Sequence, residues 1–224
     1  MRTGVVIPAA GRGTRMGGQR KPFLQLAGEP VLLHALRPFL AHPSVAAVVV
    51  ALPAAQAAAP PQWLLALDPR IQVVPGGEER GDSVRAAISR LPADLDVILV
   101  HDAARPLVSA AVVERAIATA AGGSSAIVAV PVTDTIKEVA ADGRIIATPD
   151  RRRLWAAQTP QAFPAALLRT SYERALREGI NATDDAALVA YCGGTVVVIE
   201  GERRNLKITT DADLAIAEAL LQRP

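Results

Sequence analysis

A glycine-rich loop with basic residues lies near the start of the chain, at residues 8–18 (PAAGRGTRMGG), and Lys21 follows it. Glycines let backbone N–H groups approach a phosphate closely, and Arg15 and Lys21 would neutralise charge on phosphoryl oxygens. A dinucleotide fingerprint needs a glycine at Met16, and a P-loop needs Ser or Thr where Pro22 stands. The spacing therefore predicts a phosphate loop of another kind, with a plain strand-to-helix turn as the alternative.

Lysine is rare in this chain and its positions are informative. Of the 24 basic residues only Lys21, Lys137 and Lys207 are lysine. A compact ammonium group binds phosphate in places where a forked guanidinium does not fit. Lys21 and Lys207 are therefore candidate phosphate ligands, with chance as the alternative explanation.

A second glycine turn lies at residues 75–84 (PGGEERGDSV), after a short apolar run. In open α/β sheets the loops at the carboxyl ends of strands form the ligand crevice, so Gly77 and Ser83 could read a base edge. A helix-capping motif with surface charges explains the same residues equally well.

An acidic residue follows the apolar run Val97–Val100, within the sequence HDAARP. Asp102 at the end of a central strand is well placed to hold Mg²⁺, which prefers oxygen ligands and shares its shell with substrate phosphates. Arg105 would lie in the same crevice. The alternative for Asp102 is an N-cap of the next helix. With three histidines and one cysteine in the chain, no zinc site is predicted, and His101 is interpreted as structural.

The elements that must position these residues alternate between short β-branched runs and longer Ala- and Leu-rich stretches, which is typical of an α/β fold. The predicted strands are Gly4–Ile7, Val45–Ala51, Ile71–Val74, Val97–Val100, Ala126–Val130 and Thr195–Ile199. The predicted helices are Pro30–Leu40, Ala54–Leu67, Gly81–Leu91, Ala110–Ala121, Pro164–Arg177, Asp184–Tyr191 and Asp211–Leu221. The strands are too apolar to leave one face in water, so we expect a mostly parallel central sheet with helices on both faces.

Residues 131–153 depart from this alternation. They are predicted to form a β-hairpin with its turn at Asp142-Gly143, projecting from the domain as an arm that carries Thr135 and Arg151. A projecting hairpin exposes unpaired strand edges, and a second copy of the chain is the simplest cover. A homodimer joined through this arm is therefore expected.

Composition limits the classes of protein that remain. The chain has 224 residues, 50% hydrophobic and 21% charged, which predicts one globular domain over residues 1–224. A net charge of +2 does not indicate a dedicated nucleic-acid binder. No apolar stretch approaches the ~20 residues of a membrane span, and the first residues do not form a secretory signal. Cys192 alone allows no internal disulfide, so we expect a cytoplasmic protein.

Taken together, these motifs closely resemble the 2-C-methyl-D-erythritol 4-phosphate cytidylyltransferase family. The matching segments are PAAGxGxRM at 8–16 with Lys21, GGxxRxDSV at 76–84, VHDAARP at 100–106, PVxDTxK at 131–137, DR at 150–151, LW at 154–155, QTPQ at 158–161, TD at 183–184 and NxKxT at 205–209. The resemblance spans nearly the whole chain in order. Departures are minor: Glu78 stands where aspartate is common, and Asp185 where glutamate is common.

The resemblance implies a Rossmann-like nucleotidyltransferase fold and a reaction in which CTP and methylerythritol phosphate give 4-diphosphocytidyl-2-C-methyl-D-erythritol and pyrophosphate. It implies that Arg15 and Lys21 stabilise charge on the α-phosphate and the leaving pyrophosphate, while Arg151 and Lys207 position the acceptor. It also implies that Asp102 helps to hold Mg²⁺. The residues implied to frame the cytidine are Ala9, Ala10, Gly11, Gly77 and Ser83. Those implied to bind substrate are Arg105, Thr135 and Thr159. Thr135 and Arg151 would reach the site of the partner subunit.

Two alternatives remain. A cytidylyltransferase for another polyol phosphate, above all ribitol 5-phosphate, would share the CTP half of these motifs, and only Arg151, Thr159 and Lys207 could discriminate it. A catalytically silent nucleotide-binding module is the second, but the charged site residues are all intact, which argues against it.

Overall fold

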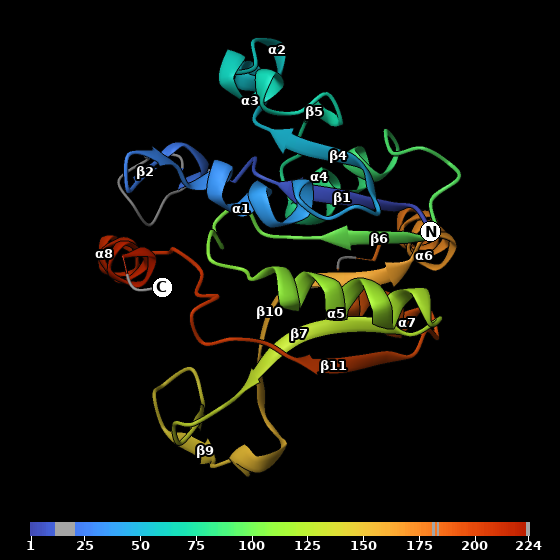
Figure 1. Ribbon diagram of the computed structural model, residues 1–224. Coiled ribbons are helices and arrows are strands. Elements are labelled where there is room, and N and C mark those ends of the chain that lie inside the picture. The colour runs from blue at the N-terminus through green and yellow to red at the C-terminus, as the bar shows by residue number, and fades with distance from the viewer. Residues whose placement is uncertain (12–20, 181, 183, 223–224) are drawn as a thin grey trace.

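The computed structural model describes residues 1–11, 21–180, 182 and 184–222, and of Lys21 it describes the backbone. Among these residues, no helix combines the length and the apolar character needed to span a bilayer. The described chain is built around one large sheet, with an arm extending beyond the ends of two neighbouring strands (Figure 1).

Seven strands of the described chain form the central sheet in the order β11-β7-β10-β6-β1-β4-β5. Their bounds are β1 Thr3–Pro8, β4 Val45–Leu52, β5 Ile71–Pro75, β6 Val97–Val100, β7 Ser125–Pro131, β10 Trp155–Pro164 and β11 Val196–Glu200. All pairs are parallel except those of β10, which runs antiparallel between β6 and β7. The prediction of a mostly parallel sheet is confirmed.

The six predicted strands are all present, but β10 was not predicted. Its sequence, WAAQTPQAFP, carries three polar residues that would be costly in an ordinary buried strand. Gln158, Thr159 and Gln161 are nevertheless at most 6% exposed. They are tolerated because each makes hydrogen bonds within the protein. Hydrophobic patterning cannot detect a strand that is stabilised in this way.

Helices cover both faces of the sheet, and alternate residues of the strands face them. Val5 and Ile7 of β1 pack with α1 (Val31–Leu40) and α5 (Ala110–Ala121) on one face. Val6 packs on the other face with α4 (Arg80–Ile88), α6 (Ala165–Glu178) and α7 (Asp185–Tyr191). The edge strand β11 pairs with β7 alone. Its residue Val198 is 48% exposed, so helices do not fully cover both faces of this strand, contrary to the prediction.

The helix predicted over Ala54–Leu67 is two short helices, α2 (Ala54–Ala58) and α3 (Gln62–Leu67). The prediction of one continuous helix is wrong because Pro60 and Pro61 interrupt it. Proline lacks the N–H that an interior helical position requires, and it also biases the residue before it away from helical geometry. The other predicted helices are present within a few residues of their expected bounds.

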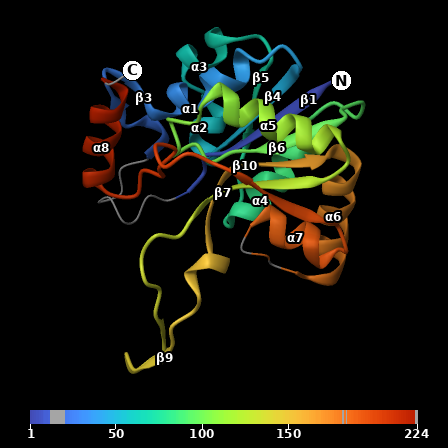
Figure 2. The same ribbon diagram turned by 60° about the horizontal axis from the view of Figure 1, so that its bottom comes forward.

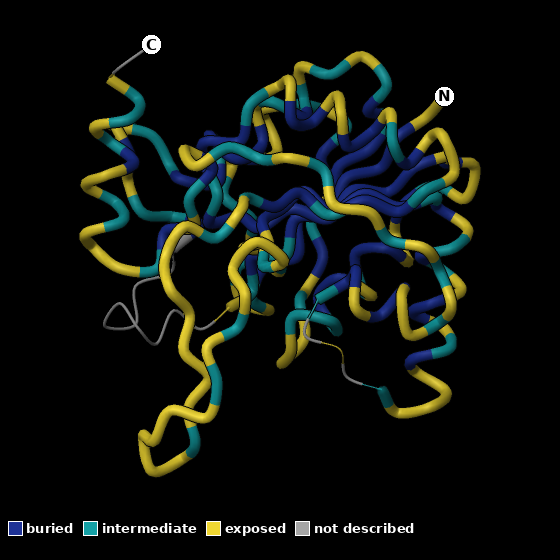
Figure 3. Tube along the Cα trace, turned by 90° about the horizontal axis from the view of Figure 1, so that it is seen from below, coloured by how far each residue is buried: buried dark blue, intermediate teal, exposed yellow. Residues whose placement is uncertain are grey.

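The arm leaves the sheet at the end of β7 and returns at the start of β10, and Figure 2 shows it extending away from the body. Its two strands, β8 (Glu138–Val139) and β9 (Ile145–Ala147), pair antiparallel, and Gly143 in the turn has φ +84°. The 3-10 helix η3 (Arg151–Arg153) follows, capped by the side chain of Asp150. Figure 3 shows the arm exposed along most of its length. The predicted hairpin is confirmed, although its paired part is short.

The chain after β11 folds back over the carboxyl ends of the strands and ends in α8 (Asp211–Leu221). This helix packs on a small apolar cluster with Leu26, Leu107 and Ile208, close to the short strands β2 (Gln25–Leu26) and β3 (Glu29–Pro30) and to η2 (Lys21–Phe23). The N–H of Ile208 donates to the carbonyl of Ala104 at 2.8 Å. The segment that carries Lys207 is thereby held against the loop that carries Asp102.

Candidate active site

The sequence motifs meet at one edge of the sheet, where the parallel strands end. Residues 9–11 follow β1, residues 76–77 follow β5, and Asp102 follows β6. From β1 the chain passes to β4 on one side, and from β6 it passes to β7 on the other side. The loops after β1 and β6 therefore diverge at a topological switch point, where open α/β sheets form their ligand crevice.

Asp102 is the centre of a charged cluster at this point. Its carboxylate lies 2.8 Å from Nζ of Lys207, 3.5 Å from Nε of Arg80 and 3.6 Å from Nε of Arg105. Asp102 is 7% exposed, and burial alone would raise the pKa of its carboxyl. The charges of Lys207 and Arg80 outweigh that effect and hold the pKa at about 2, so Asp102 is ionised at neutral pH.

Buried hydrogen bonds fix the loop that carries Asp102. The backbone N–H of Asp102 donates to Oγ1 of Thr159 at 3.0 Å. That hydroxyl also lies 3.0 Å from Nδ1 of His101, and Nε2 of His101 lies 3.0 Å from the carbonyl of Arg105. Since a carbonyl can only accept, His101 carries its proton on Nε2 and Nδ1 accepts from Thr159. Burial lowers the pKa of His101 to about 4, so the ring is neutral at neutral pH, and its hydrogen bonds hold the loop in place.

Arg105 joins the Asp102 loop to the Lys207 segment. Its guanidinium donates to the carbonyls of Asn205 at 2.8 Å and Ala157 at 3.2 Å. Burial lowers the pKa of Arg105, although the nearby Asp102 opposes this effect. Asn205 is fully buried and donates to the carbonyl of Thr159 at 2.8 Å. Lys207 is held by these neighbours while its own side chain stays 43% exposed.

Close backbone packing brings the two glycine turns together. A Cβ on Gly76 would collide with the Cβ of Ala10 and would crowd Oγ of Ser83. The N–H of Gly77 donates to Oγ of Ser83 at 3.2 Å, and this hydroxyl donates to the carbonyl of Glu79 at 3.3 Å. Of the predicted cytidine residues, Ala10, Gly77 and Ser83 therefore lie together in one cradle. Ala9 and Gly11 flank Ala10 in the chain, and Ala9 is buried while Gly11 is exposed.

Arg80 belongs to the charged cluster, but motif analysis gave it no role. It is the first residue of α4, and its Nη1 lies 2.8 Å from Oδ2 of Asp185 at the start of α7. Burial alone would lower the pKa of Arg80, but the carboxylates of Asp185 and Asp102 outweigh it and raise the pKa. The position of Arg80 in the first helical turn after a glycine-rich loop was a sequence signal that could have indicated a role in the site. The partner in α7 lies far away in sequence and could not be read from the motif.

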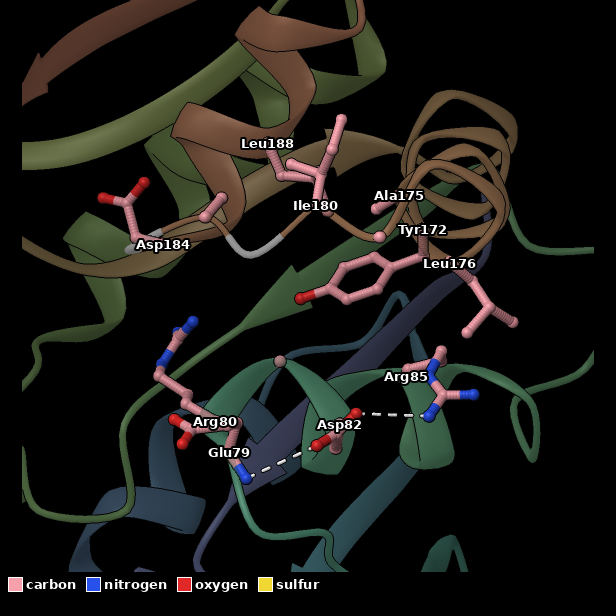
Figure 4. Close-up of a pocket in the computed structure, with 13 residues that line it drawn as sticks. Glu79, Arg80, Asp82, Arg85, Tyr172, Ala175, Leu176, Ile180, Asp184 and Leu188 are labelled. Atoms are coloured by element: carbon pink, nitrogen blue, oxygen red, sulfur yellow. Dashed lines mark hydrogen bonds and ion pairs between the residues drawn. The ribbon is translucent and has the colours of Figure 1, made fainter.

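A cavity of about 440 Å³ opens beside Arg80, between α4, α6 and α7. Figure 4 shows Arg80 extending from the start of α4 toward α7, while Arg85 turns back to Asp82. Tyr172, Leu176 and Leu188 form part of its apolar wall. The cavity adjoins the charged cluster through Arg80.

Some predicted site residues are not joined to this cluster. Thr135 and Arg151 are exposed on the arm, where Nη1 of Arg151 donates to the carbonyl of Thr133 at 2.6 Å. Arg15 lies outside the described residues, as does the side chain of Lys21. Thr159 is 4% exposed and its hydroxyl is engaged with His101 and Asp102. A direct contact between Thr159 and a substrate therefore stays a prediction.

Within the described ranges, no three His, Cys, Asp or Glu side chains gather as a metal-binding group. Mg²⁺ does not require such a group, because one or two carboxylates suffice when substrate phosphates and water complete its shell. Asp102 is an ionised carboxylate just after the carboxyl end of β6, so its chemistry fits this kind of site.

Nucleotidyl transfer needs binding of a polyphosphate, neutralisation of its charge and exact positioning rather than a covalent intermediate. The switch point brings glycine turns and clustered cations together, an arrangement suited to this chemistry, and the fold is that of a nucleotidyltransferase. A crystal structure titled 4-diphosphocytidyl-2C-methyl-D-erythritol synthase, from Anaerococcus prevotii, has a TM-score of 0.87 at 28% identity and covers 99% of this chain and 96% of its own. That of 2-C-methyl-D-erythritol 4-phosphate cytidylyltransferase from Thermus thermophilus has a TM-score of 0.84 at 37% identity, covering 99% and 100%.

The chain belongs to the 2-C-methyl-D-erythritol 4-phosphate cytidylyltransferase family, whose profile matches residues 3–223. A relative of that name from Symbiobacterium thermophilum is 46% identical over 220 residues, covering 97% of this chain and 92% of its own. The family resemblance drawn from the motifs is thus confirmed, and with it the cytidylyltransferase class of the enzyme.

Proposed function

We propose that this enzyme transfers the cytidylyl group of CTP to 2-C-methyl-D-erythritol 4-phosphate at the crevice around Asp102, in non-mevalonate isoprenoid biosynthesis. The observation that carries the proposal is the ion pair of 2.8 Å between Asp102 and Lys207, next to the cradle of Ala10, Gly76 and Ser83. It brings a cation suited to a phosphate beside a surface suited to a nucleotide.

The reaction balances without a general base. A phosphate oxygen of the acceptor forms a bond to the α-phosphorus of CTP, and the bond from that phosphorus to the β-phosphate bridging oxygen breaks. Pyrophosphate leaves with the electron pair, and 4-diphosphocytidyl-2-C-methyl-D-erythritol remains. The acceptor phosphate is already ionised at neutral pH, so the site has to supply positioning and positive charge.

The residues divide this work between the two substrates. Ala9, Ala10, Gly11, Gly77 and Ser83 frame the cytidine, as the approach of the two glycine turns supports. Lys207, half exposed beside Asp102, positions the acceptor phosphate, and Arg105 keeps the two loops together. Arg15 and Lys21 stabilise charge on the α-phosphate and the departing pyrophosphate, in keeping with their place in the first loop.

We further propose that Asp102 holds Mg²⁺. A bound magnesium ion would offset the negative charge of the phosphates. The residue suits this role because its carboxylate is ionised and follows the carboxyl end of β6, beside the proposed phosphate ligand Lys207. Lys207 and Arg80 keep the carboxylate oriented from its two sides.

A homodimer is the proposed assembly, formed by one cytidylyltransferase domain over residues 1–224 with the arm 131–153 as its contact. Val139, Ile145 and Ile146 on the arm are 54%, 57% and 58% exposed, which is costly for apolar side chains in water. A second copy that covers them would bring Thr135 and Arg151 toward its own crevice. The single cysteine suits a reducing cytoplasm, the proposed location.

Pyrophosphate release tests the acceptor. The full-length enzyme is given CTP and Mg²⁺ with either methylerythritol phosphate or ribitol 5-phosphate, in parallel. Release with methylerythritol phosphate alone is expected. Release with ribitol 5-phosphate alone would reassign the acceptor, and no release with either would overturn the proposed activity.

A further inference from the structure

A line of polar contacts leads from the interior of the protein to Asp102. The hydroxyl of Tyr172, on α6, donates to Oδ1 of Asp185 on α7. Oδ2 of Asp185 lies 2.8 Å from Nη1 of Arg80, and Nε of Arg80 lies 3.5 Å from Oδ1 of Asp102. Arg80 thus connects the buried end of α7 with the charged cluster at the crevice.

Asp185 lies too deep to meet a substrate, because it is fully buried. Burying a charged pair is expensive, and replacing such pairs with apolar residues often leaves a protein equally stable. Stability alone is therefore a weak reason for a carboxylate at this position. A buried carboxylate can, however, fix the direction of an arginine fork.

The two oxygens of Asp102 face different cations. Lys207 lies on the Oδ2 side and Arg80 on the Oδ1 side. Lys207 is half exposed and is the proposed ligand of the acceptor phosphate, so it can exchange Asp102 for substrate. Arg80 is 30% exposed and is anchored from behind by Asp185, so it can keep the carboxylate in place throughout.

We propose that Arg80 is a positioning residue for cytidylyl transfer, oriented by Asp185 and Tyr172, and that it acts by fixing the carboxylate of Asp102. The inference rests on the proposed role of Asp102 in this site. It assigns a task to three residues that neither frame the nucleotide nor meet the acceptor.

A double-mutant cycle in the full-length enzyme tests this inference. We expect Arg80→Gln to lower kcat about 10- to 100-fold, the usual effect of removing an orienting partner, with KM for both substrates nearly unchanged. If Arg80 acts through Asp102, the double variant Arg80→Gln/Asp102→Asn should be no slower than Asp102→Asn alone. Losses that multiply would overturn the inference, since Arg80 would then act independently.

Weaker variants extend the test if Asp102→Asn leaves no measurable rate. Arg80→Lys keeps the charge but cannot contact both carboxylates, and Asp185→Asn removes the anchor. Their combined loss in kcat should equal the larger single loss, and a product of the two losses would overturn the inference. Tyr172→Phe should lower kcat less than Asp185→Asn does, because it removes one hydrogen bond and no charge.

Arg85→Gln is the matched control. Arg85 lies on the same helix and pairs with Asp82 at the surface, so kcat should not change. Thermal unfolding of every variant separates loss of folding from loss of positioning. A fall in kcat that only follows a fall in Tm would contradict the inference. Full activity of Asp102→Asn would instead remove Asp102 from the site, whatever Arg80 does.

Discussion

Asp102 shows how one residue can be buried and still ionised. Desolvation opposes its charge, but the neighbouring ammonium and guanidinium groups stabilise it more strongly. His101, the adjacent residue, faces the opposite balance. It is fully buried, and desolvation of the charged ring lowers its pKa to about 4, although its hydrogen bonds with Arg105 and Thr159 oppose this fall. Two neighbouring buried residues thus keep different charges, because nearby opposite charges outweigh desolvation at Asp102 and nothing outweighs it at His101.

The low pKa of His101 predicts a pH dependence of stability. Between about pH 6.5 and pH 4 the unfolded chain binds a proton at this residue and the folded chain does not. The free energy of unfolding should therefore be unaffected above pH 6.5 and should fall by about 2 kcal/mol at pH 5. Urea unfolding of the wild type at pH 7.5 and pH 5 measures the change.

His101→Gln provides the comparison, since glutamine does not titrate and can still bond with Thr159 and Arg105. The fall in stability between the two pH values should be smaller in this variant by a similar amount. An equal fall in both proteins would show that His101 is not the titrating group. Asp102 does not interfere, because its stabilising charge is lost only as the pH falls through about 4 to 2.

Lys207 should matter most to the acceptor. Lys207→Met removes a charge-assisted contact worth about 1.5–3 kcal/mol, so kcat/KM for methylerythritol phosphate should fall about 10- to 100-fold. Steady-state kinetics with each substrate varied in turn should show the larger rise in KM for the acceptor. Lys207→Arg keeps the charge on a bulkier fork and should restore only part of the loss. An unchanged KM for the acceptor in the Met variant would contradict the proposed role.

At the scale of elements, the proposed nucleotide cradle depends on the close approach of the backbone at the glycine turns. Gly76→Ala should raise KM for CTP, because the new methyl group collides with Ala10 and forces the two loops apart. Gly81→Ala is the matched control: its new methyl group meets no atom within 4 Å. Its position in α4 should raise stability by about 0.5–1 kcal/mol. Equal KM values for CTP in both variants would show that the cradle does not bind the nucleotide.

Much of this architecture could be predicted because its signals are local. Apolar runs marked the parallel strands, and residues after their carboxyl ends marked the crevice. β10 escaped prediction because its buried polar groups are satisfied by partners from distant segments. The role of Arg80 escaped for the same reason, since Asp185 reaches it only after folding. The break between α2 and α3 did have a local signal, the adjacent prolines Pro60 and Pro61, and the predicted continuous helix gave it too little weight.

At the scale of the whole molecule, the arm predicts that activity is shared between subunits. Arg15→Ala and Arg151→Ala should each be inactive alone. Mixing them should restore part of the activity, because a hybrid dimer contains one site with both residues intact if the arm completes the partner's crevice. Pyrophosphate release before and after subunit exchange measures this. No recovery after proven exchange would show that each site is built from one chain.

The arm also has a consequence for how this fold can vary. It joins β7 to β10, two neighbouring antiparallel strands, and Pro131 lies opposite Trp155 where it begins and ends. Such ends could be closed by a short turn without shifting the register of the sheet, and added length costs little loop entropy. Insertions and deletions can therefore accumulate here while the parallel strands stay constant. The sheet therefore places little restraint on the arm, and the proposed contribution of Thr135 and Arg151 to the partner's site is what would limit changes there.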